Sequence, residues 1–152
     1  ALTCHRVVYY GDFINPDDGW NGYVKAQQTG PDLGERMLNA FREQAVAGAG
    51  KMVIVGSDCL DITAGHIERA FGALDAADVV IGPALDGGYY LLGMKQLYPF
   101  LFEDMPWSQP GLRKLTERVI RENNLTFALL DELTDIDEWS DYEQFLARNS
   151  RR

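Results

Sequence analysis

Apolar residues in this chain follow two patterns, short continuous runs and a helical spacing. Helical spacing places Leu33, Met37 and Phe41 on one face of a helix over about 32–47, with Asp32 as its N-cap. Similar stripes predict helices around 67–74, over 107–124 with Ser108 as a candidate N-cap, and over 140–149. The runs are rich in β-branched and aromatic residues and predict strands at "RVVYY" (6–10), "KMVIVG" (51–56), "DVVIGPAL" (78–85), "YYLLGM" (89–94) and "TFALL" (126–130).

Strands and helices therefore alternate along the chain, which predicts an α/β fold with a mostly parallel sheet. The run at 51–56 is apolar on both faces, as in a buried parallel strand. The sequence Asp86-Gly87-Gly88 is a tight-turn signal between two strands, so one antiparallel hairpin is expected. The length of 152 residues suits a single domain over 1–152, and no internal repeat or linker is evident.

The composition excludes several classes of function. At 46% hydrophobic residues the chain can form a core, and no apolar run is long enough to span a bilayer. A formal net charge of -9 disfavours nucleic acid as a partner, so an anionic ligand would need a metal or a helix N-terminus. The two cysteines form no disulfide or metal pattern, which favours a reducing, cytoplasmic location.

Asp58 follows the apolar run at 53–55 by a few residues. Ligands of open α/β sheets bind beyond the carboxyl ends of the strands, and hard divalent cations prefer oxygen ligands. Asp58 is therefore a candidate cation ligand. A carboxylate that caps the loop or the following helix explains the same position, and the spacing alone does not separate the two.

Four segments resemble one bacterial family of proposed glycosyltransferases, which are uncharacterised and partly associated with radical-SAM and selenium genes. The resemblance covers most of the chain in the family order. It implies a three-layer, Rossmann-like GT-A fold, that of the nucleotide-diphospho-sugar transferases. The matching segments are "QQTGPDLGERM" (27–37), "GSDCLDIT" (56–63), "GPALDGGYYLLGM" (82–94) and "LFEDMPWS" (101–108).

The resemblance implies a divalent cation, Mg²⁺ or Mn²⁺, with Asp58 as the ligand that bridges it to the nucleotide diphosphate. The spacing is D-x-x-D, so the second ligand need not be Asp61, which could cap the helix starting near Thr63. Related nucleotidyltransferases have a late segment that 135–145 resembles, and it implies Asp137 as a second metal ligand. A solvated acidic loop before a helix remains the alternative for that segment.

The same resemblance places Asp86, Gly87 and Gly88 beside the sugar or the acceptor. Asp86 would orient an acceptor hydroxyl or act as the general base. Tyr89 is the adjoining substrate-binding candidate, since at most one of Tyr89 and Tyr90 can face a pocket from a strand. A plain Asp-Gly hairpin turn explains the same residues without any ligand.

Gly34 and Arg36 lie in the first turn of the predicted first helix. Glycine costs about 1 kcal/mol there relative to alanine, which indicates a close approach by another group. Arg36 could bind an anion of the substrate or pair with Asp32 at helical spacing. Trp107 and Ser108 are candidates for a wall of the acceptor pocket, or else a core tryptophan and an N-cap.

The chain departs from the family at its start, where the basic, glycine-containing loop that would hold the nucleotide is absent. We therefore expect a domain truncated at its N-terminus, with exposed sheet edges that favour a homo-oligomer. The resemblance, together with this departure, implies three alternative functions. They are metal-assisted glycosyl transfer from a nucleotide-diphospho-sugar to a small acceptor, nucleotidyl transfer to a phosphorylated small molecule, and a non-catalytic interaction module.

Overall fold

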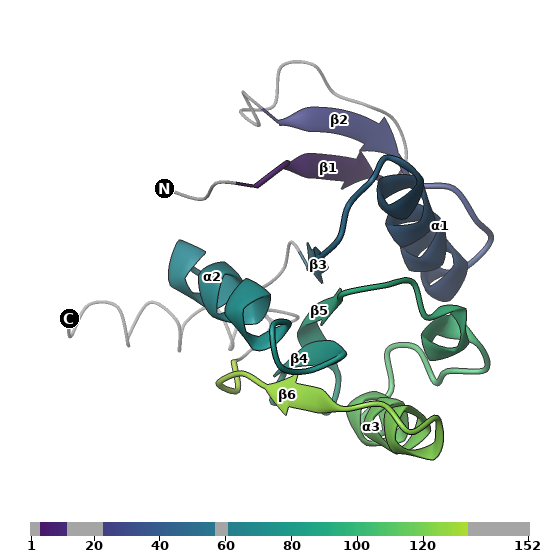
Figure 1. Ribbon diagram of the computed structural model, residues 1–152. Helices are drawn as coiled ribbons and strands as arrows, with labels where there is room; N and C mark the ends of the chain where they lie inside the picture. The colour runs from purple at the N-terminus through teal and green to yellow at the C-terminus, as the bar shows by residue number, and fades with distance from the viewer. Residues whose placement is uncertain (1–3, 12–22, 57–60, 134–152) are drawn as a thin grey trace, which may run out of the picture.

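The computed structural model describes residues 4–11, 23–56 and 61–133, and Figure 1 shows how their elements are arranged. Each predicted strand and the first three predicted helices are present, while the predicted helix at 140–149 lies outside the described residues. The elements are β1 (Val7–Tyr10), β2 (Val24–Gln27), α1 (Leu33–Val46), β3 (Met52–Val55), α2 (Ala64–Ala73), β4 (Val79–Pro83), β5 (Tyr89–Met94), η1 (Pro99–Phe102), α3 (Leu112–Glu122) and β6 (Phe127–Leu129).

The described strands form two sheets, a parallel pair β1–β2 and a four-stranded sheet in the order β3-β5-β4-β6. β5 is antiparallel to both β3 and β4, whereas β4 and β6 are parallel. The prediction of a mostly parallel sheet is therefore wrong, whereas the expected antiparallel hairpin is present and the sheet is mixed. The reason is the hairpin, because it places the one reversed strand between β3 and β4 and makes two of the three pairings antiparallel.

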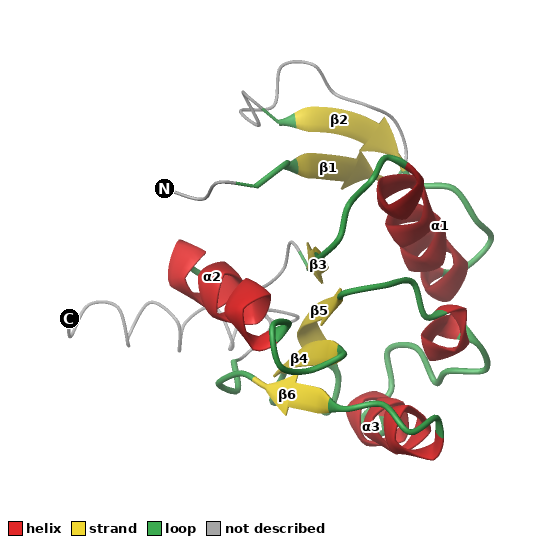
Figure 2. Cartoon of the chain, in the orientation of Figure 1, coloured by secondary structure: helices red, strands yellow, loops and turns green. Residues whose placement is uncertain are grey.

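Helices cover both faces of the four-stranded sheet, which gives three layers (Figure 2). Val79 and Ile81 of β4 point to one face and pack in a core cluster with residues of α1, η1 and α3, including Phe41 and Ile120. Val80 points to the other face, where it packs with residues of α2 such as Ala70. The alternation along β4 follows from the two-residue period of a strand, and all five residues of β4 are buried.

β3 differs from the buried central strand that its sequence predicts. It lies at the edge of the four-stranded sheet, and only Met52 is buried, while Val55 is 40% exposed. β2 was not predicted at all, since Lys25 and Gln27 are polar and its neighbours are rich in glycine and asparagine. For β3, the apolar run thus predicted the strand at 52–55 correctly, but it wrongly predicted that this strand is buried on both faces.

The helix starts show which capping signals were correct. Asp32 is the N-cap of α1 and its Oδ1 accepts a hydrogen bond from the Glu35 N–H at 2.9 Å, as predicted. Ser108 is not the cap of α3, which begins at Leu112 after Gly111. Ser108 has a φ of 61°, outside the extended conformation of an N-cap, and Pro110 biases the preceding residue away from the helical region.

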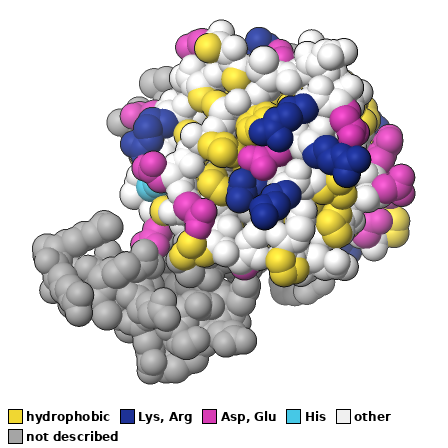
Figure 3. All heavy atoms as spheres, turned by 90° about the horizontal axis from the view of Figure 1, so that it is seen from below, with side chains coloured by type: hydrophobic (Ala, Val, Ile, Leu, Met, Phe, Trp, Pro, Cys, Tyr) yellow, Lys and Arg dark blue, Asp and Glu magenta, His cyan; other side chains and the backbone are white. Residues whose placement is uncertain are grey.

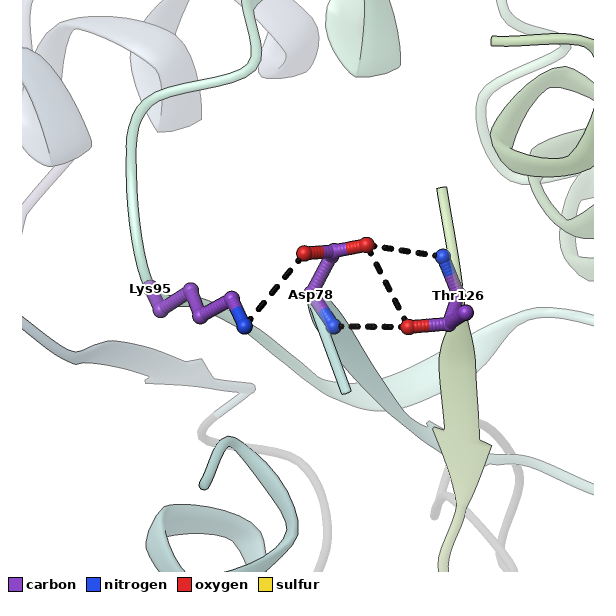
Figure 4. Close-up of polar contacts among 3 residues, drawn as sticks. All are labelled: Asp78, Lys95 and Thr126. Atoms are coloured by element: carbon purple, nitrogen blue, oxygen red, sulfur yellow. Dashed lines mark hydrogen bonds and ion pairs between the residues drawn. The ribbon is translucent and has the colours of Figure 1, made fainter. Parts of the chain in front are cut away.

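Asp78 joins the starts of β4 and β6 (Figure 4). Its Oδ2 accepts hydrogen bonds from the Thr126 N–H at 2.9 Å and from Thr126 Oγ1 at 3.2 Å, and its own N–H donates to Thr126 Oγ1 at 3.2 Å. Lys95 Nζ lies 3.4 Å from Asp78 Oδ1. The hydrogen bond from the Thr126 backbone, helped by Lys95, lowers the pKa of the Asp78 carboxyl below its usual 3.8.

Replacing Asp78 with alanine is expected to lower the free energy of unfolding by about 1–3 kcal/mol at neutral pH, the usual range for hydrogen bonds to a charged group. Because the folded pKa is depressed, this stabilisation is present above pH 3.8 and is lost as the pH falls through the folded value. Urea denaturation at several pH values measures it. Lys95→Ala is the control and should cost less than about 1 kcal/mol, since that ion pair is partly exposed. Equal losses in the two variants would contradict the assignment.

Candidate functional site

Three strands end at the same edge of the four-stranded sheet. β3 and β4 are both antiparallel to β5, and β6 is parallel to β4, so β3, β4 and β6 point the same way. Val55 of β3 and Gly82 of β4 both pair with Leu91, so the ends of β3 and β4 flank the start of β5. This edge, at the carboxyl ends of three strands, is where ligands of open α/β sheets bind.

The turn at Asp86 projects from this edge and has the predicted hairpin geometry. The Gly87 N–H donates to the Ala84 carbonyl at 3.1 Å, and the Ala84 N–H donates to the Gly88 carbonyl at 3.0 Å. Oδ1 of Asp86 accepts the Gly88 N–H at 2.9 Å, and no other hydrogen bond of Asp86 is present among the described residues. The carboxylate is exposed, so it can shape the turn with one oxygen and meet a ligand with the other.

Gly87 is held against the segment that leads into α3. It has a φ of 94°, and a Cβ added there would lie 2.0 Å from the Pro110 carbonyl oxygen. The Arg113 N–H also donates to the Gly87 carbonyl at 3.0 Å. The backbone of the segment before α3 therefore approaches Gly87 closely, and the contact fixes the position of Asp86. Gly88 has more room, since a Cβ there would lie 3.3 Å from its nearest neighbour.

Trp107 occupies the space that Gly34 leaves open. A Cβ on Gly34 would lie 2.6 Å from Cζ2 of the Trp107 indole, so the predicted close approach in the first turn of α1 is confirmed. Trp107 is half-buried and packs against the core cluster on the α1 face of the sheet, while Ser108 is exposed. This contact joins two of the segments that carry the family resemblance, 27–37 and 101–108. The resemblance alone did not show that these two segments touch.

Arg36 has partners within its own segment. Its Nε donates to the Gly30 carbonyl at 3.0 Å and its Nη1 to Oε1 of Gln28 at 3.4 Å. Gln28 in turn donates from Nε2 to the Tyr9 carbonyl at 3.2 Å. The expected pairing with Asp32 is absent from the described ion pairs, because the guanidinium closes the loop between β2 and α1 instead. A role of Arg36 in binding an anion stays a prediction.

The two predicted metal ligands, Asp58 and Asp137, lie outside the described residues. The described chain next to each of them reaches the same edge. The Gly56 N–H donates to the Tyr90 carbonyl at 3.1 Å, and Leu133 pairs with Ala84, two residues before Asp86. Among the residues that the structure describes, no three His, Cys, Asp or Glu side chains are grouped to hold a metal.

The two tyrosines at the start of β5 have different environments. The Tyr90 hydroxyl donates to the Asp131 carbonyl at 2.8 Å, which ties β5 to the segment after β6. The Tyr89 hydroxyl is buried and has no hydrogen-bond partner within the described part of the chain, and burial raises the pKa of Tyr89 above its usual 10.0. A buried hydroxyl without a partner costs free energy. Tyr89, the predicted substrate-binding residue, is thus the one that retains hydrogen-bonding capacity.

His66 has a role that the sequence analysis missed. Thr63 is the N-cap of α2, and Nδ1 of His66 accepts the Thr63 N–H at 3.0 Å. The expectation that Asp61 caps this helix is wrong. The His66 ring also contacts Tyr90 edge-on, with 6.2 Å between centroids, so the N-terminus of α2 lies near the edge where β5 begins. Histidine three residues after an N-cap is the signal that could have been read.

Basic side chains gather on the face seen in Figure 3, the side on which α3 and β6 lie in Figure 1. α3 pairs two of its arginines internally, Arg113 with Glu117 at 3.1 Å and Arg118 with Glu122 at 2.9 Å. Arg121 stacks over Phe127 at 5.0 Å. These contacts are typical of a charged helix face and do not indicate an anion site.

A hollow of about 590 Å³ lies between α1 and η1 and contains none of the predicted site residues. Its lining includes Asp32, Glu35, Glu103 and Asp104, with Arg42 as its one basic residue. Because negative side chains outnumber positive ones in this lining, the hollow does not suit a nucleotide, and we do not include it in the candidate site.

Comparison with solved structures shows the class of fold. The chain is similar to a proposed nucleotide-diphospho-sugar transferase from Desulfovibrio desulfuricans G20, with a TM-score of 0.79 and 29% identity. The match covers 90% of this chain and 62% of that one, so the chain spans less than two thirds of that protein's length. The fold is thus an α/β fold resembling that of a nucleotide-diphospho-sugar transferase.

The family follows from the sequence match. The model of the family "Uncharacterized protein conserved in bacteria (DUF2064)" matches residues 6–109, and the chain belongs to this family. The matched range contains all four segments on which the resemblance depended. No curated protein matches the chain. No helix in the described part of the chain has the length and apolar character needed to cross a membrane.

Proposed function

We propose that this protein catalyses metal-assisted transfer of a sugar from a nucleotide-diphospho-sugar to a small acceptor. The observation that carries the proposal is the meeting of β3, β4 and β6 at one edge, with the exposed Asp86 carboxylate on a turn that projects from it. The similarity to a nucleotide-diphospho-sugar transferase supports the choice of donor.

Asp58 and Asp137 are the proposed ligands of Mg²⁺ or Mn²⁺. Support comes from Gly56 and Leu133, the last described residues before them, which lie two and four positions earlier in the chain and pair with residues beside the candidate site. The cation, when bound, would neutralise the charge on the departing nucleoside diphosphate. Carboxylate oxygens are the ligands that these cations prefer.

Asp86 is the proposed acceptor-side residue, which would orient an acceptor hydroxyl or take its proton. Support comes from its exposure and from the rigid turn that holds it. The Gly87 backbone is fixed between Ala84 and Arg113, so the carboxylate has a defined position. Tyr89 is the proposed substrate-binding residue next to this turn, and its buried hydroxyl has no hydrogen-bond partner among the described residues.

Replacing Asp58 with alanine is expected to abolish the metal-dependent part of nucleotide binding. Calorimetric titration of nucleoside diphosphates and their sugars, with and without Mn²⁺, measures the affinity, and we expect a loss of about tenfold or more, equivalent to about 1.4 kcal/mol. Asp75→Ala is the matched control, because Asp75 follows the far end of α2 and pairs with Lys51 at the surface. Unchanged Mn²⁺-dependent binding in the Asp58 variant would remove the proposal.

The products separate glycosyl transfer from the other two functions. Glycosyl transfer releases a nucleoside diphosphate, whereas nucleotidyl transfer from a nucleoside triphosphate releases pyrophosphate. A folded protein that binds no nucleotide with either metal would favour the interaction module. Titration and product analysis on the complete natural protein therefore decide among the three.

A further inference from the structure

Two buried polar atoms beside the Asp86 turn have no hydrogen-bond partner among the described residues. They are the Tyr89 hydroxyl and Nε of Arg113. A buried polar group without a partner costs free energy, and native proteins contain few of them. The two atoms therefore indicate a missing partner on one side of the hairpin.

Both residues lie on the side of the hairpin that faces α3. Tyr89 packs against the core cluster that contains Ile120 of α3. Arg113 lies in the first turn of α3, and its backbone N–H donates to the Gly87 carbonyl at 3.0 Å. The start of α3 therefore contacts the turn that carries the proposed acceptor-side carboxylate.

The guanidinium of Arg113 is held in place but only partly used. Its Nη1 donates to Oε1 of Glu117 at 3.1 Å, and the two side chains are 22% and 11% exposed. Arginine has five N–H groups in a planar fork, so this ion pair leaves donors over, including Nε. An ion pair at this spacing is ordinary helix chemistry, and the buried Nε is the feature that it does not explain.

These polar groups define what a missing partner must offer. An arginine N–H can only donate, so Nε needs an acceptor oxygen. The Asp86 carboxylate can only accept, so its second oxygen needs a donor. A hydroxyl-bearing compound supplies both kinds of group, and the Tyr89 hydroxyl can bind it in either role.

The charge around the turn disfavours an anionic compound. The described charged side chains near it are negative at Asp86, Glu117, Asp131 and Glu132 and positive at Arg113 and Lys114. Carboxylates therefore outnumber cations, and Arg113 already shares its charge with Glu117. A carboxylate or phosphate group would meet a negative field here.

We propose that Arg113 is a second acceptor-side residue and that the acceptor is a neutral compound with several hydroxyl groups, a sugar or a polyol. Arg113 and Tyr89 would bind an oxygen of the acceptor, while Asp86 would accept a hydrogen bond from the hydroxyl that reacts. The inference rests on the proposed function, because it names the acceptor of the same site. Both atoms are covered in this structure, so the compound binds with a local rearrangement at the start of α3, which lowers its affinity.

NMR titration of the complete natural protein without nucleotide or metal tests the class of acceptor. The probes are glucose, mannose, galactose and glycerol, each paired with its phosphate monoester. At least one neutral probe should bind at millimolar concentration, and its phosphate should bind about tenfold more weakly. Preferred binding of the phosphates, or binding of no probe, would overturn the proposal. Since no nucleotide is present, a failure here is distinct from unchanged nucleotide binding in the Asp58 variant.

Arg113→Lys tests the role of the side chain, because it keeps the charge beside Glu117 and removes Nε. It should weaken binding of the neutral probe about five- to tenfold, as expected for the loss of a hydrogen bond from a charged group. Arg118→Lys is the matched control, since Arg118 pairs with Glu122 at the same spacing and is 73% exposed. Equal affinities of these two variants would overturn the assignment of Arg113.

Tyr89→Phe removes only the hydroxyl and separates binding from stability. Because the unpartnered buried hydroxyl costs free energy, this variant should melt about 2 °C or more above the natural protein. It should also bind the neutral probe more weakly. A lower melting temperature would show that the hydroxyl has a structural partner, and that result or unchanged binding would overturn the role of Tyr89.

Discussion

Replacing Gly87 with alanine is expected to lower the free energy of unfolding by about 2–5 kcal/mol. Two costs add. A residue with a Cβ is strained at a φ of 94°, by about 1–2 kcal/mol, and the Cβ would lie 2.0 Å from the Pro110 carbonyl oxygen. Relieving that overlap moves the backbone of the half-buried Gly87 turn or of the exposed Pro110 segment, which costs about 1–3 kcal/mol. Urea denaturation measures the change.

Gly48→Ala separates the two costs at Gly87. Gly48 has a φ of 102° and no atom within 4 Å of an added Cβ, so it isolates the backbone strain. We expect it to cost about 1 kcal/mol, clearly less than Gly87→Ala. Equal effects in the two variants would show that the Pro110 contact is unimportant. Because Gly87 positions Asp86, its replacement should also weaken binding of the proposed acceptor.

Replacing Gly34 with alanine is expected to have the second large effect on the free energy of unfolding. Helix propensity and packing predict opposite signs for this change. Helix propensity alone would favour alanine in α1 by about 1 kcal/mol. The Trp107 ring, however, lies 2.6 Å from the added Cβ and is a rigid, half-buried group. We expect a net loss of about 1–3 kcal/mol in the free energy of unfolding, with a shift in the tryptophan fluorescence maximum.

Gly72→Ala is the matched control, since Gly72 lies in α2 with no atom within 4 Å of an added Cβ. It should stabilise the protein by about 0.5–1 kcal/mol. If Gly34→Ala and Gly72→Ala both stabilised the protein, this would mean that the Trp107 ring moves away from the added Cβ at little cost in free energy. The opposite signs expected here test the contact and not the propensity.

The local structure could be predicted where one residue dictates it. Asp32 caps α1 because its side chain reaches the Glu35 N–H, and that requirement is visible in the sequence. β4 is a strand of five buried residues, and its unbroken apolar run predicts it. The turn at Asp86 needs a residue that accepts a positive φ, and Gly87 supplies it.

The arrangement of strands could not be predicted, because it depends on contacts between distant residues. The sequence gives no sign that β5 passes between β3 and β4, and that placement makes the sheet mixed. Ser108 resembles an N-cap, but the conformation imposed around Pro110 starts α3 four residues later. The strand β2 was missed because of its polar residues, and it is its pairing with β1 that makes this segment a strand.

The candidate site could be predicted only in part, because the sequence does not show which groups its residues contact. Gly34 signalled a close approach, yet the sequence could not name Trp107 as the group that approaches. For Arg36 the sequence offered a substrate anion or Asp32, whereas the structure pairs its guanidinium with the Gly30 carbonyl and with Gln28. The role of Asp58 as a metal ligand remains a prediction from the sequence.

The central hairpin has a consequence for how the sheet assembles. Within the four-stranded sheet, β4 and β5 are joined by a short turn, so pairs such as Ile81 with Leu92 form at a small loss of chain entropy. Pairing of Val53 with Gly93, or of Val80 with Ala128, closes a far longer loop. We therefore expect the hairpin to form early as a folding nucleus, with β3 and β6 adding to its two sides afterwards.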